Sequence, residues 1–330
     1  MNQLSATMTR LGGVNLLPLI VALVALALIG APSIWITLTV AGLAMGMMLF
    51  LMASGLSLVF GLMDVLNFGH SAFASLGAFV AATVLAHMSG WLGADSWVLN
   101  LGALAIAIAA AVGAGLIGGF LFETVIIRPV YRDHLRQILI TMGALIVSEQ
   151  LIIVVWGGSP LPVARPKILQ GAFIWGNVSI ENYRIFAVAL GVMVYAGLYV
   201  LLNRTRVGLL IRAGVENREM VEALGFRIGR LFIGVFMLGS ALAAMGGAMW
   251  AGYQQLISPD MGAKMMIVVF IVVIIGGLGS IEGTLLGALL VGLIDNYVGF
   301  LLPKAALASN MVLMMVILMW RPNGLRPAAK

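Results

Sequence analysis

Polar side chains gather at two places inside otherwise apolar sequence, and these are the residues that could act on a solute. The first place is the segment FGLMDVLNFGHSAFASLG, and its polar members are Asp64, Asn67, His70, Ser71 and Ser75. Polar groups in such surroundings usually face the interior of a helical bundle. We therefore assign these five residues to a candidate translocation path. The alternative is a tight hairpin whose polar groups only satisfy freed backbone.

The second place is the segment GGLGSIEGTLLG. Its candidate path residues are Gly276, Gly279, Ser280, Glu282 and Thr284. Glycines break helical regularity here, and non-helical backbone at membrane depth is tolerated only when it is buried in protein or lines a cavity. The same two interpretations, a path or gate and a structural hairpin, apply to this segment.

No constellation in the sequence indicates covalent chemistry. It lacks a G-x-x-x-x-G-K-[ST] phosphate loop, a G-x-S-x-G elbow and an H-E-x-x-H pair. No second histidine or carboxylate stands at a metal-ligand spacing from His70. The chain also has no cysteine. We therefore expect no catalytic residue, no metal and no cofactor in this chain, and we do not expect an enzyme.

The elements that must hold these residues are membrane spans. Hydrophobic residues make up 62% of the 330-residue chain and charged residues only 9%, against about 25% charged in soluble domains. A span needs about 20 apolar residues. We predict an all-α, polytopic helical bundle of about ten spans, with residues 1–330 forming a single integral membrane domain. The predicted spans are 14–30, 34–60, 69–88, 98–126, 137–156, 184–202, 230–252, 264–280, 284–302 and 305–320.

The distribution of basic residues predicts the orientation of these spans. With a cytoplasmic N-terminus, 13 of the 18 lysines and arginines fall in inside loops and five fall in outside loops. Lysine and arginine concentrate on the cytoplasmic side of membrane proteins. We therefore predict that both termini are cytoplasmic.

Two long loops interrupt the apolar sequence. The loop 203–230 is predicted to be cytoplasmic and carries six arginines and three glutamates. Residues 219–224 tolerate a helix and Gly225 can end it, so the loop looks like a short helical docking piece. Its apolar pairs argue against the alternative of a solvated connector. The loop 157–183 contains three prolines, and we predict that it forms an ordered cap on the outer side.

Glu149 is a carboxylate deep inside a predicted span, and it supports an alternative transport mechanism. It lies with Gln150 in the middle of the predicted span 137–156. We favour a structural interhelical hydrogen bond for this pair. A stand-alone secondary transporter of small solutes, driven by a proton or sodium gradient, is the alternative, and its activity would depend on Glu149 or Asp64.

Several motifs together resemble the permeases of branched-chain amino acid ABC importers. These motifs are NFGHSAFASLGAF, ETVIIRPVYRDHLRQILITMG, TRVGLLIRAGVENREMVEALGFRIGRLFIGVFMLGSALAAMGG, ISPDMG, IGGLGSIEGTLLGALLVGLIDN and ILMWRPNGL. The resemblance covers residues 40–325, and the motifs stand in the order found in the family. The sequence resembles the first, high-affinity member of a two-permease set more than the second. One departure is Ser71-Ala72-Phe73, where the first member more often has a glycine and a glutamate. A second is the extra span before Ser33.

The resemblance implies a transport subunit of the bacterial inner membrane with several partners. They are two cytoplasmic ABC ATPase subunits that bind ATP and Mg, a second similar permease, and an external substrate-binding protein. A heterodimer of permeases is favoured over a homodimer. The coupling helix that docks the ATPase would lie within 214–225. The residues implied in this coupling are Gly214, Glu216, Asn217, Arg218, Glu219, Glu222, Ala223, Leu224 and Gly225.

The substrate remains open at the level of the sequence. Relatives in this family handle branched-chain amino acids, urea, short amides or aromatic acids. The predicted path is mostly apolar, which suits a small molecule delivered by a binding protein. Specificity would then lie largely in that other protein.

Overall fold

The computed structural model describes residues 14 to 327, except residues 64, 66, 132, 217 and 226. The larger apolar helices are α2 (Leu17–Ile29), α3 (Pro32–Met63), α4 (His70–His87), α6 (Trp97–Phe122), α7 (His134–Trp156), α9 (Asn182–Arg204), α12 (Ile228–Gln254), α13 (Met261–Gly276), α14 (Ile281–Leu301) and α15 (Ala306–Trp320). The shorter helical elements are α5 (Ser89–Gly93), the π-helix η1 (Glu123–Ile127), the 3-10 turn η2 (Arg128–Val130), α8 (Lys167–Gln170), α10 (Arg206–Glu216), α11 (Arg218–Ala223) and the 3-10 turn η3 (Pro303–Ala305).

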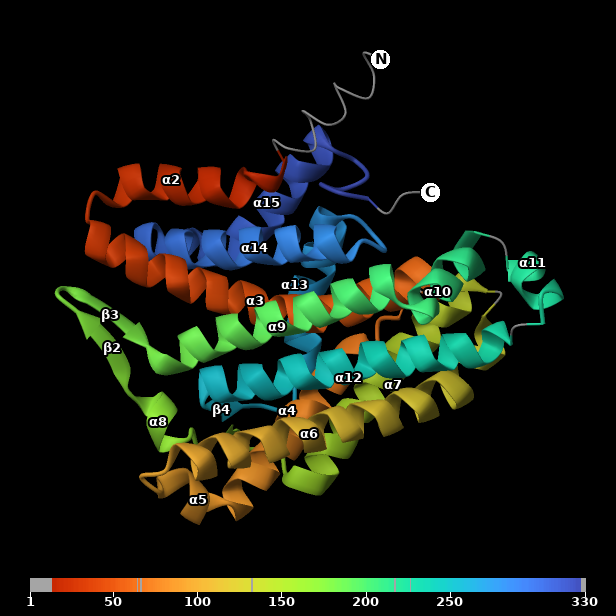
Figure 1. The fold of residues 1–330 in the computed structure, drawn as a ribbon, viewed down its shortest axis with the longest axis horizontal. Coiled ribbons are helices and arrows are strands. Elements are labelled where there is room, and N and C mark those ends of the chain that lie inside the picture. The colour runs from red at the N-terminus through yellow and green to blue at the C-terminus, as the bar shows by residue number, and fades with distance from the viewer. Residues whose placement is uncertain are drawn as a thin grey trace.

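Within the described part of the chain, four short strands accompany these helices. They are β1 (Leu161–Pro162), β2 (Ala172–Trp175), β3 (Val178–Glu181) and β4 (Leu256–Ile257). β1 pairs antiparallel with β4, and β2 and β3 form a hairpin. The molecule is therefore mostly helical, as predicted, and the strands belong to the loops at one end of the bundle (Figure 1).

Each of the ten predicted spans falls on one of the larger apolar helices. Among the residues that the structure describes, seven helices are long and apolar enough to cross a membrane: α3, α4, α6, α7, α9, α12 and α14. The other three, α2, α13 and α15, have 13, 16 and 15 residues. At 1.5 Å per residue they are about 20–24 Å long, less than the hydrocarbon core of about 30 Å. The count of ten complete spans therefore stays a prediction.

Local sequence explains where several helices begin. The side chain of Ser96 accepts from the backbone N–H of Leu99 at the start of α6. Asp133 accepts from the N–H of Arg136 at the start of α7, and Ser280 accepts from the N–H of Gly283 at the start of α14. Serine and aspartate are favoured at this position because they satisfy N–H groups that have no partner within the helix.

The core of the bundle lies around α3, α4 and α12. In α3, 83% of the most apolar stretch is buried, against 11% in α7 and 17% in α9. α12 packs on α3, α4 and α6, while α14 packs on α3. The rest of the described chain therefore leaves most of the apolar surface of α7 and α9 uncovered.

Small residues let α4 and α12 approach closely. A Cβ atom placed on Gly247 would lie 1.9 Å from the carbonyl oxygen of Ala74, and one on Gly77 would lie 2.1 Å from that of Ala244. No side chain larger than hydrogen fits at either position. Glycine at these two positions therefore permits the close packing of α4 against α12.

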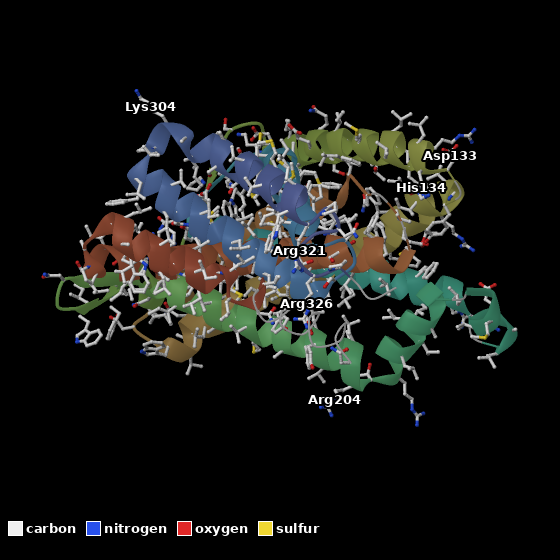
Figure 2. All side chains as sticks on the ribbon, turned by 90° about the horizontal axis from the view of Figure 1, so that it is seen from above. Asp133, His134, Arg204, Lys304, Arg321 and Arg326 are labelled. Atoms are coloured by element: carbon white, nitrogen blue, oxygen red, sulfur yellow. The ribbon has the colours of Figure 1, made fainter. Side chains whose placement is uncertain are left out.

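The two ends of the bundle carry different loops. α10 and α11 project from one end, and the β2–β3 hairpin, α5 and α8 lie at the other (Figure 1). Figure 2 shows Asp133 and His134 toward the end that carries α11, and Lys304 toward the end that carries the hairpin. The loops predicted to lie inside and outside the cell therefore separate in space.

Candidate functional site

The first polar segment forms a buried cluster at the start of α4. The side chains of Asn67, His70, Ser71 and Ser75 are all at most 2% exposed. His70 Nε2 lies 3.1 Å from the carbonyl oxygen of Met52 in α3. Asp64 lies outside the described residues.

The turn before α4 is held by side chains rather than by a regular helix. The amide oxygen of Asn67 accepts from the backbone N–H of Gly69 at 2.9 Å. The backbone N–H of Phe68 donates to the hydroxyl of Thr141 in α7 at 3.1 Å. α4 therefore begins within the bundle, beside Thr141. This is the non-helical backbone that the glycines around the segment predict.

Several polar atoms of this cluster lack a hydrogen-bond partner among the described residues. They are Nδ2 of Asn67, Nδ1 of His70 and the hydroxyls of Ser71 and Ser75. A buried polar group without a partner costs about 1–3 kcal/mol. Buried polar atoms are normally satisfied by protein groups or by ordered water. The path and the structural hairpin both stay predictions for this segment.

The second polar segment forms the turn between α13 and α14 and is tied to the end of the chain. The carboxylate of Glu282 pairs with Arg326 at 2.7 Å. Ser280 caps α14, and its carbonyl oxygen accepts from the hydroxyl of Thr284 at 2.7 Å. The backbone N–H of Arg326 donates to the carbonyl of Gly276 at 2.9 Å. The polar groups of this turn therefore already have partners inside the chain.

The structure brings the two polar segments together. A Cβ atom on Gly61, at the end of α3, would lie 2.5 Å from the Cα atom of Gly279. The rings of Phe68 and Phe270 stack with their centroids 4.7 Å apart. The two segments are far apart in the sequence, yet the end of α3 contacts the turn between α13 and α14.

The loop 203–230 contains two helices instead of one. Gly214 lies in α10, and α11 covers residues 218 to 223. Asn217 lies outside the described residues. Gly225 ends the second helix with a φ of 87°, and its N–H donates to the carbonyl of Glu222 at 3.0 Å. The expectation that this glycine terminates a helix is confirmed, and the physical reason is its left-handed backbone.

The segment formed by α10 and α11, here called the loop lobe, exposes apolar side chains. Leu209, Met220 and Leu224 are 63%, 57% and 70% exposed. Glu222 and Ala223 are also exposed. Val221 is buried and anchors α11 on Ile228 at the start of α12. The lobe thus contacts the bundle through Val221 and exposes several apolar side chains elsewhere, and exposed apolar side chains of this kind are typical of an interaction surface.

A basic cleft lies beside the loop lobe. It has a volume of about 1020 Å³ and lies between η1–η2 and the start of α12. Its arginines are Arg128, Arg227 and Arg230, all of them exposed, and Glu222 also lines it. Glu123 lies at the buried wall, and its carboxylate accepts from the hydroxyl of Tyr131 at 2.6 Å. From the sequence, these arginines were charged residues of separate loops, and nothing indicated that they line one cleft.

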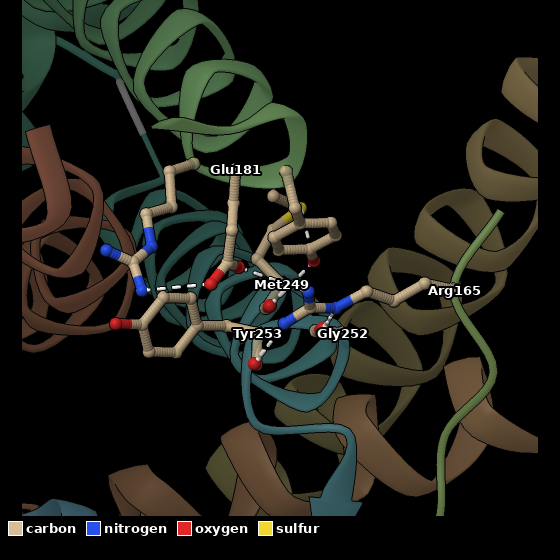
Figure 3. A network of polar contacts seen from close by, with 7 residues as sticks. Arg165, Glu181, Met249, Gly252 and Tyr253 are labelled. Carbon is tan, nitrogen blue, oxygen red and sulfur yellow. Dashed lines mark hydrogen bonds and ion pairs between the residues drawn. The ribbon is translucent and has the colours of Figure 1, made fainter. Parts of the chain in front are cut away.

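A polar network closes the opposite end of α12, and the sequence did not reveal it. Arg165 donates to the carbonyls of Gly252 and Tyr253 in the last turn of α12 and pairs with Glu181 at 3.2 Å (Figure 3). Glu181 also pairs with Arg184 at 3.1 Å. A cation at a helix C-terminus satisfies carbonyls that have no partner within the helix. The three-proline loop is therefore fixed to the bundle by a side chain.

Comparison with known proteins identifies relatives over most of the chain. A family model described as "Branched-chain amino acid transport system / permease component" matches residues 38–320. The high-affinity branched-chain amino acid transport system permease protein BraD of Pseudomonas aeruginosa is 29% identical, over 86% of this chain and 93% of BraD. The corresponding protein LivH of Salmonella typhimurium is 26% identical, over 86% of this chain and 92% of LivH. The probable branched-chain amino acid transport permease protein LivM of Methanocaldococcus jannaschii is 26% identical, over 84% and 90%. No solved structure matches the chain.

Proposed function

Because this chain belongs to the permease family of branched-chain amino acid transport systems, we propose that it is the membrane-spanning subunit of an ATP-binding-cassette importer in the bacterial inner membrane. In this role it translocates branched-chain amino acids, or a similar small substrate, that an external binding protein delivers. ATP and Mg are bound by a separate ATPase, because the chain has no phosphate loop of its own.

The observation that carries this proposal is the loop lobe. It joins α9 to α12 and projects from the end of the bundle (Figure 1), and its side chains Leu209, Met220 and Leu224 are exposed. A partner that moves the lobe would move both attached helices, because a rigid element transmits a displacement to the helices joined to it. The basic cleft beside the lobe adds a surface complementary to acidic groups.

The remaining partners are assigned by the surfaces they would cover. A second, similar permease fits α7 and α9, whose apolar surface this chain leaves mostly uncovered. The external binding protein fits the hairpin end, where Phe173, Ile174 and Trp175 are exposed. We favour two different permease chains over two copies of this one, on the family resemblance.

Co-purification tests the ATPase partner directly. An affinity-tagged chain solubilised from native membranes is expected to bring down an ATPase subunit. Gly225→Pro is expected to reduce the amount recovered, because proline cannot adopt the φ of 87° and removes the N–H that ends α11. Membrane insertion should be unchanged.

A matched control is Gly176→Pro in the hairpin. Gly176 also has a positive φ, of 59°, and both glycines have open space where a Cβ would lie. This control should recover as much ATPase as the unmodified chain. Full recovery with Gly225→Pro, together with unchanged ATP-driven uptake, would show that α11 does not couple the ATPase. Uptake driven by an ion gradient without any ATPase would favour the secondary transporter instead.

A further inference from the structure

A crevice between α4, α7 and the start of α13, too narrow to admit a water molecule, is lined by a carboxylate that does not belong to the buried cluster. Its polar lining is formed by Ser75 of α4 and by Ser148 and Glu149 of α7, with Gly262 of α13 opposite. Ser75 lines the crevice and also belongs to the buried cluster. The crevice therefore places Glu149 beside the polar region at the start of α4.

Glu149 lies well inside the apolar helix α7, away from both of its ends. It is the sixteenth of the 23 residues of α7, which ends at Trp156. At 1.5 Å per residue it stands about 10 Å from that end and about 22 Å from the other. A carboxylate at this depth costs several kcal/mol when it faces lipid, so such groups face the bundle interior or a water-filled cavity.

Among the described residues, no side chain forms a hydrogen bond or an ion pair with the carboxylate of Glu149. The predicted interhelical hydrogen bond is therefore not formed within this part of the chain. The hydroxyl of Ser75 also lacks a partner there. Only 11% of the most apolar stretch of α7 is buried. The described chain thus presents an unpaired carboxylate on a helix that it leaves largely uncovered.

The start of α13 shows that charged groups are accommodated beside the crevice. A Cβ atom on Gly262 would lie 2.6 Å from the hydroxyl oxygen of Ser75 and 2.9 Å from the carbonyl oxygen of Ser71. Within one turn of Gly262, Lys264 pairs with Asp260 at 2.5 Å, and both side chains are substantially exposed. An exposed ion pair beside a buried helix start is compatible with water or protein, and not with lipid.

We propose that Glu149 lines the substrate path of the assembled permease and receives the ammonium group of the substrate. The hydroxyls of Ser75 and Ser148 extend the same polar wall. A carboxylate attracts a cationic group and repels an anionic one, so this position selects amino acids over acids that lack an amino group. This role rests on the proposed permease function and makes Glu149 a residue that determines specificity.

The test uses the absence of cysteine from the natural chain. Ser148→Cys replaces one hydroxyl by a thiol in the crevice, and the variant is studied in native membrane vesicles with its partners present. Reaction rates are measured with a cationic and an anionic water-soluble methanethiosulfonate of similar size. The rate with the cationic reagent is divided by the rate with the anionic reagent, and this ratio is then divided by the same ratio for a free thiol in solution. We expect a preference of roughly tenfold or more for the cationic reagent, from the nearby carboxylate.

Adding Glu149→Gln in the Ser148→Cys background should abolish this preference. Adding Gln150→Ala instead is the matched control, because Gln150 is the neutral, exposed neighbour of Glu149, and it should leave the preference unchanged. Leu145→Cys, which lines the same crevice one turn earlier, provides a second reporter if Ser148→Cys does not insert. In transport assays Glu149→Gln should lower uptake of the amino acid while leaving the recovered ATPase unchanged.

Two results would overturn the proposal. One is failure of both cysteines to react with either reagent, because the crevice would then not be part of an aqueous path. The other is a charge preference that survives Glu149→Gln. Neither result touches the importer assignment, which fails separately if the unmodified chain brings down no ATPase.

Discussion

Arg165 offers the clearest test of how the outer loop is attached to the bundle. Its side chain is only 9% exposed, and it donates to two carbonyls at the end of α12 while pairing with Glu181 (Figure 3). Gln255, which follows α12 with a φ of 59°, places its amide beside the same guanidinium. Arg165→Ala removes all of these interactions at once and leaves the two carbonyls without this donor.

The expected decrease in the free energy of unfolding follows from the interactions that the guanidinium of Arg165 makes. A hydrogen bond that involves a charged group contributes about 1.5–3 kcal/mol, and removal of one member of a buried ion pair costs about 3–5 kcal/mol. We take about 3 kcal/mol as the expected decrease in the free energy of unfolding, because Glu181 is partly exposed and keeps Arg184 as a partner. At about 2–4 °C per kcal/mol, the melting temperature should fall by about 6 °C or more.

The assay is thermal unfolding of the detergent-solubilised chain, followed by the fraction that remains monodisperse after heating. Arg165→Lys should be destabilised to an intermediate degree, because an ammonium group cannot reach two carbonyls and a carboxylate in the fork geometry of arginine. Lys167→Ala is the matched control in the same loop. Lys167 pairs at 2.6 Å with Asp95, and both side chains are well exposed, so removing this pair should cost about 0–1 kcal/mol.

A melting temperature for Arg165→Ala within about 2 °C of the unmodified chain would refute this reasoning. So would a Lys167→Ala variant as unstable as Arg165→Ala, because the effect would then come from the charge of the loop and not from the hydrogen bonds to α12. A double-mutant cycle with Glu181→Gln separates the ion pair from the two carbonyl hydrogen bonds.

Three other changes test the packing of the bundle. Gly247→Leu should prevent folding and abolish recovery of monodisperse protein, because its side chain would meet the backbone of α4, whereas Gly113→Leu should be tolerated, since open space surrounds Gly113. Asn100→Leu should destabilise the chain by about 2 kcal/mol in the same melting assay, because its buried amide donates to three backbone carbonyls that precede α6 and accepts from the N–H of Ile168 in α8. Trp156→Phe should cost about 1 kcal/mol by melting temperature, because it removes the 2.8 Å hydrogen bond from the indole to Thr83.

Local properties of the sequence predicted the helices. Apolar runs placed each larger helix, because a helix in lipid must satisfy its own backbone and expose apolar side chains. Gly225 was predicted to end a helix from its residue type alone, and the left-handed backbone confirms it. The interior position of Asn67 and His70 was also predictable, because polar groups in apolar sequence are driven inward.

Interactions between distant segments could not be predicted in the same way. Arg165 meets Gly252 across 87 positions, and Arg128 shares a cleft with Arg227 although the two lie in different loops. The sequence around Arg165 or Arg128 does not indicate which distant residue each of them lies beside. Likewise, Glu282 was a candidate for the path, and its ion pair with Arg326 appears only when the end of the chain folds back on α14.

The sequence by itself determined that this chain is a helical membrane protein, which loops between its helices carry charge, and the family to which it belongs. These properties follow from composition and from motifs that act within a few residues. Only the tertiary structure decided which polar groups find partners and which do not. Helix packing sets the distance between side chains far apart in the sequence, and it places Glu149 in one crevice with Ser75, on a helix that the rest of the described chain leaves largely uncovered.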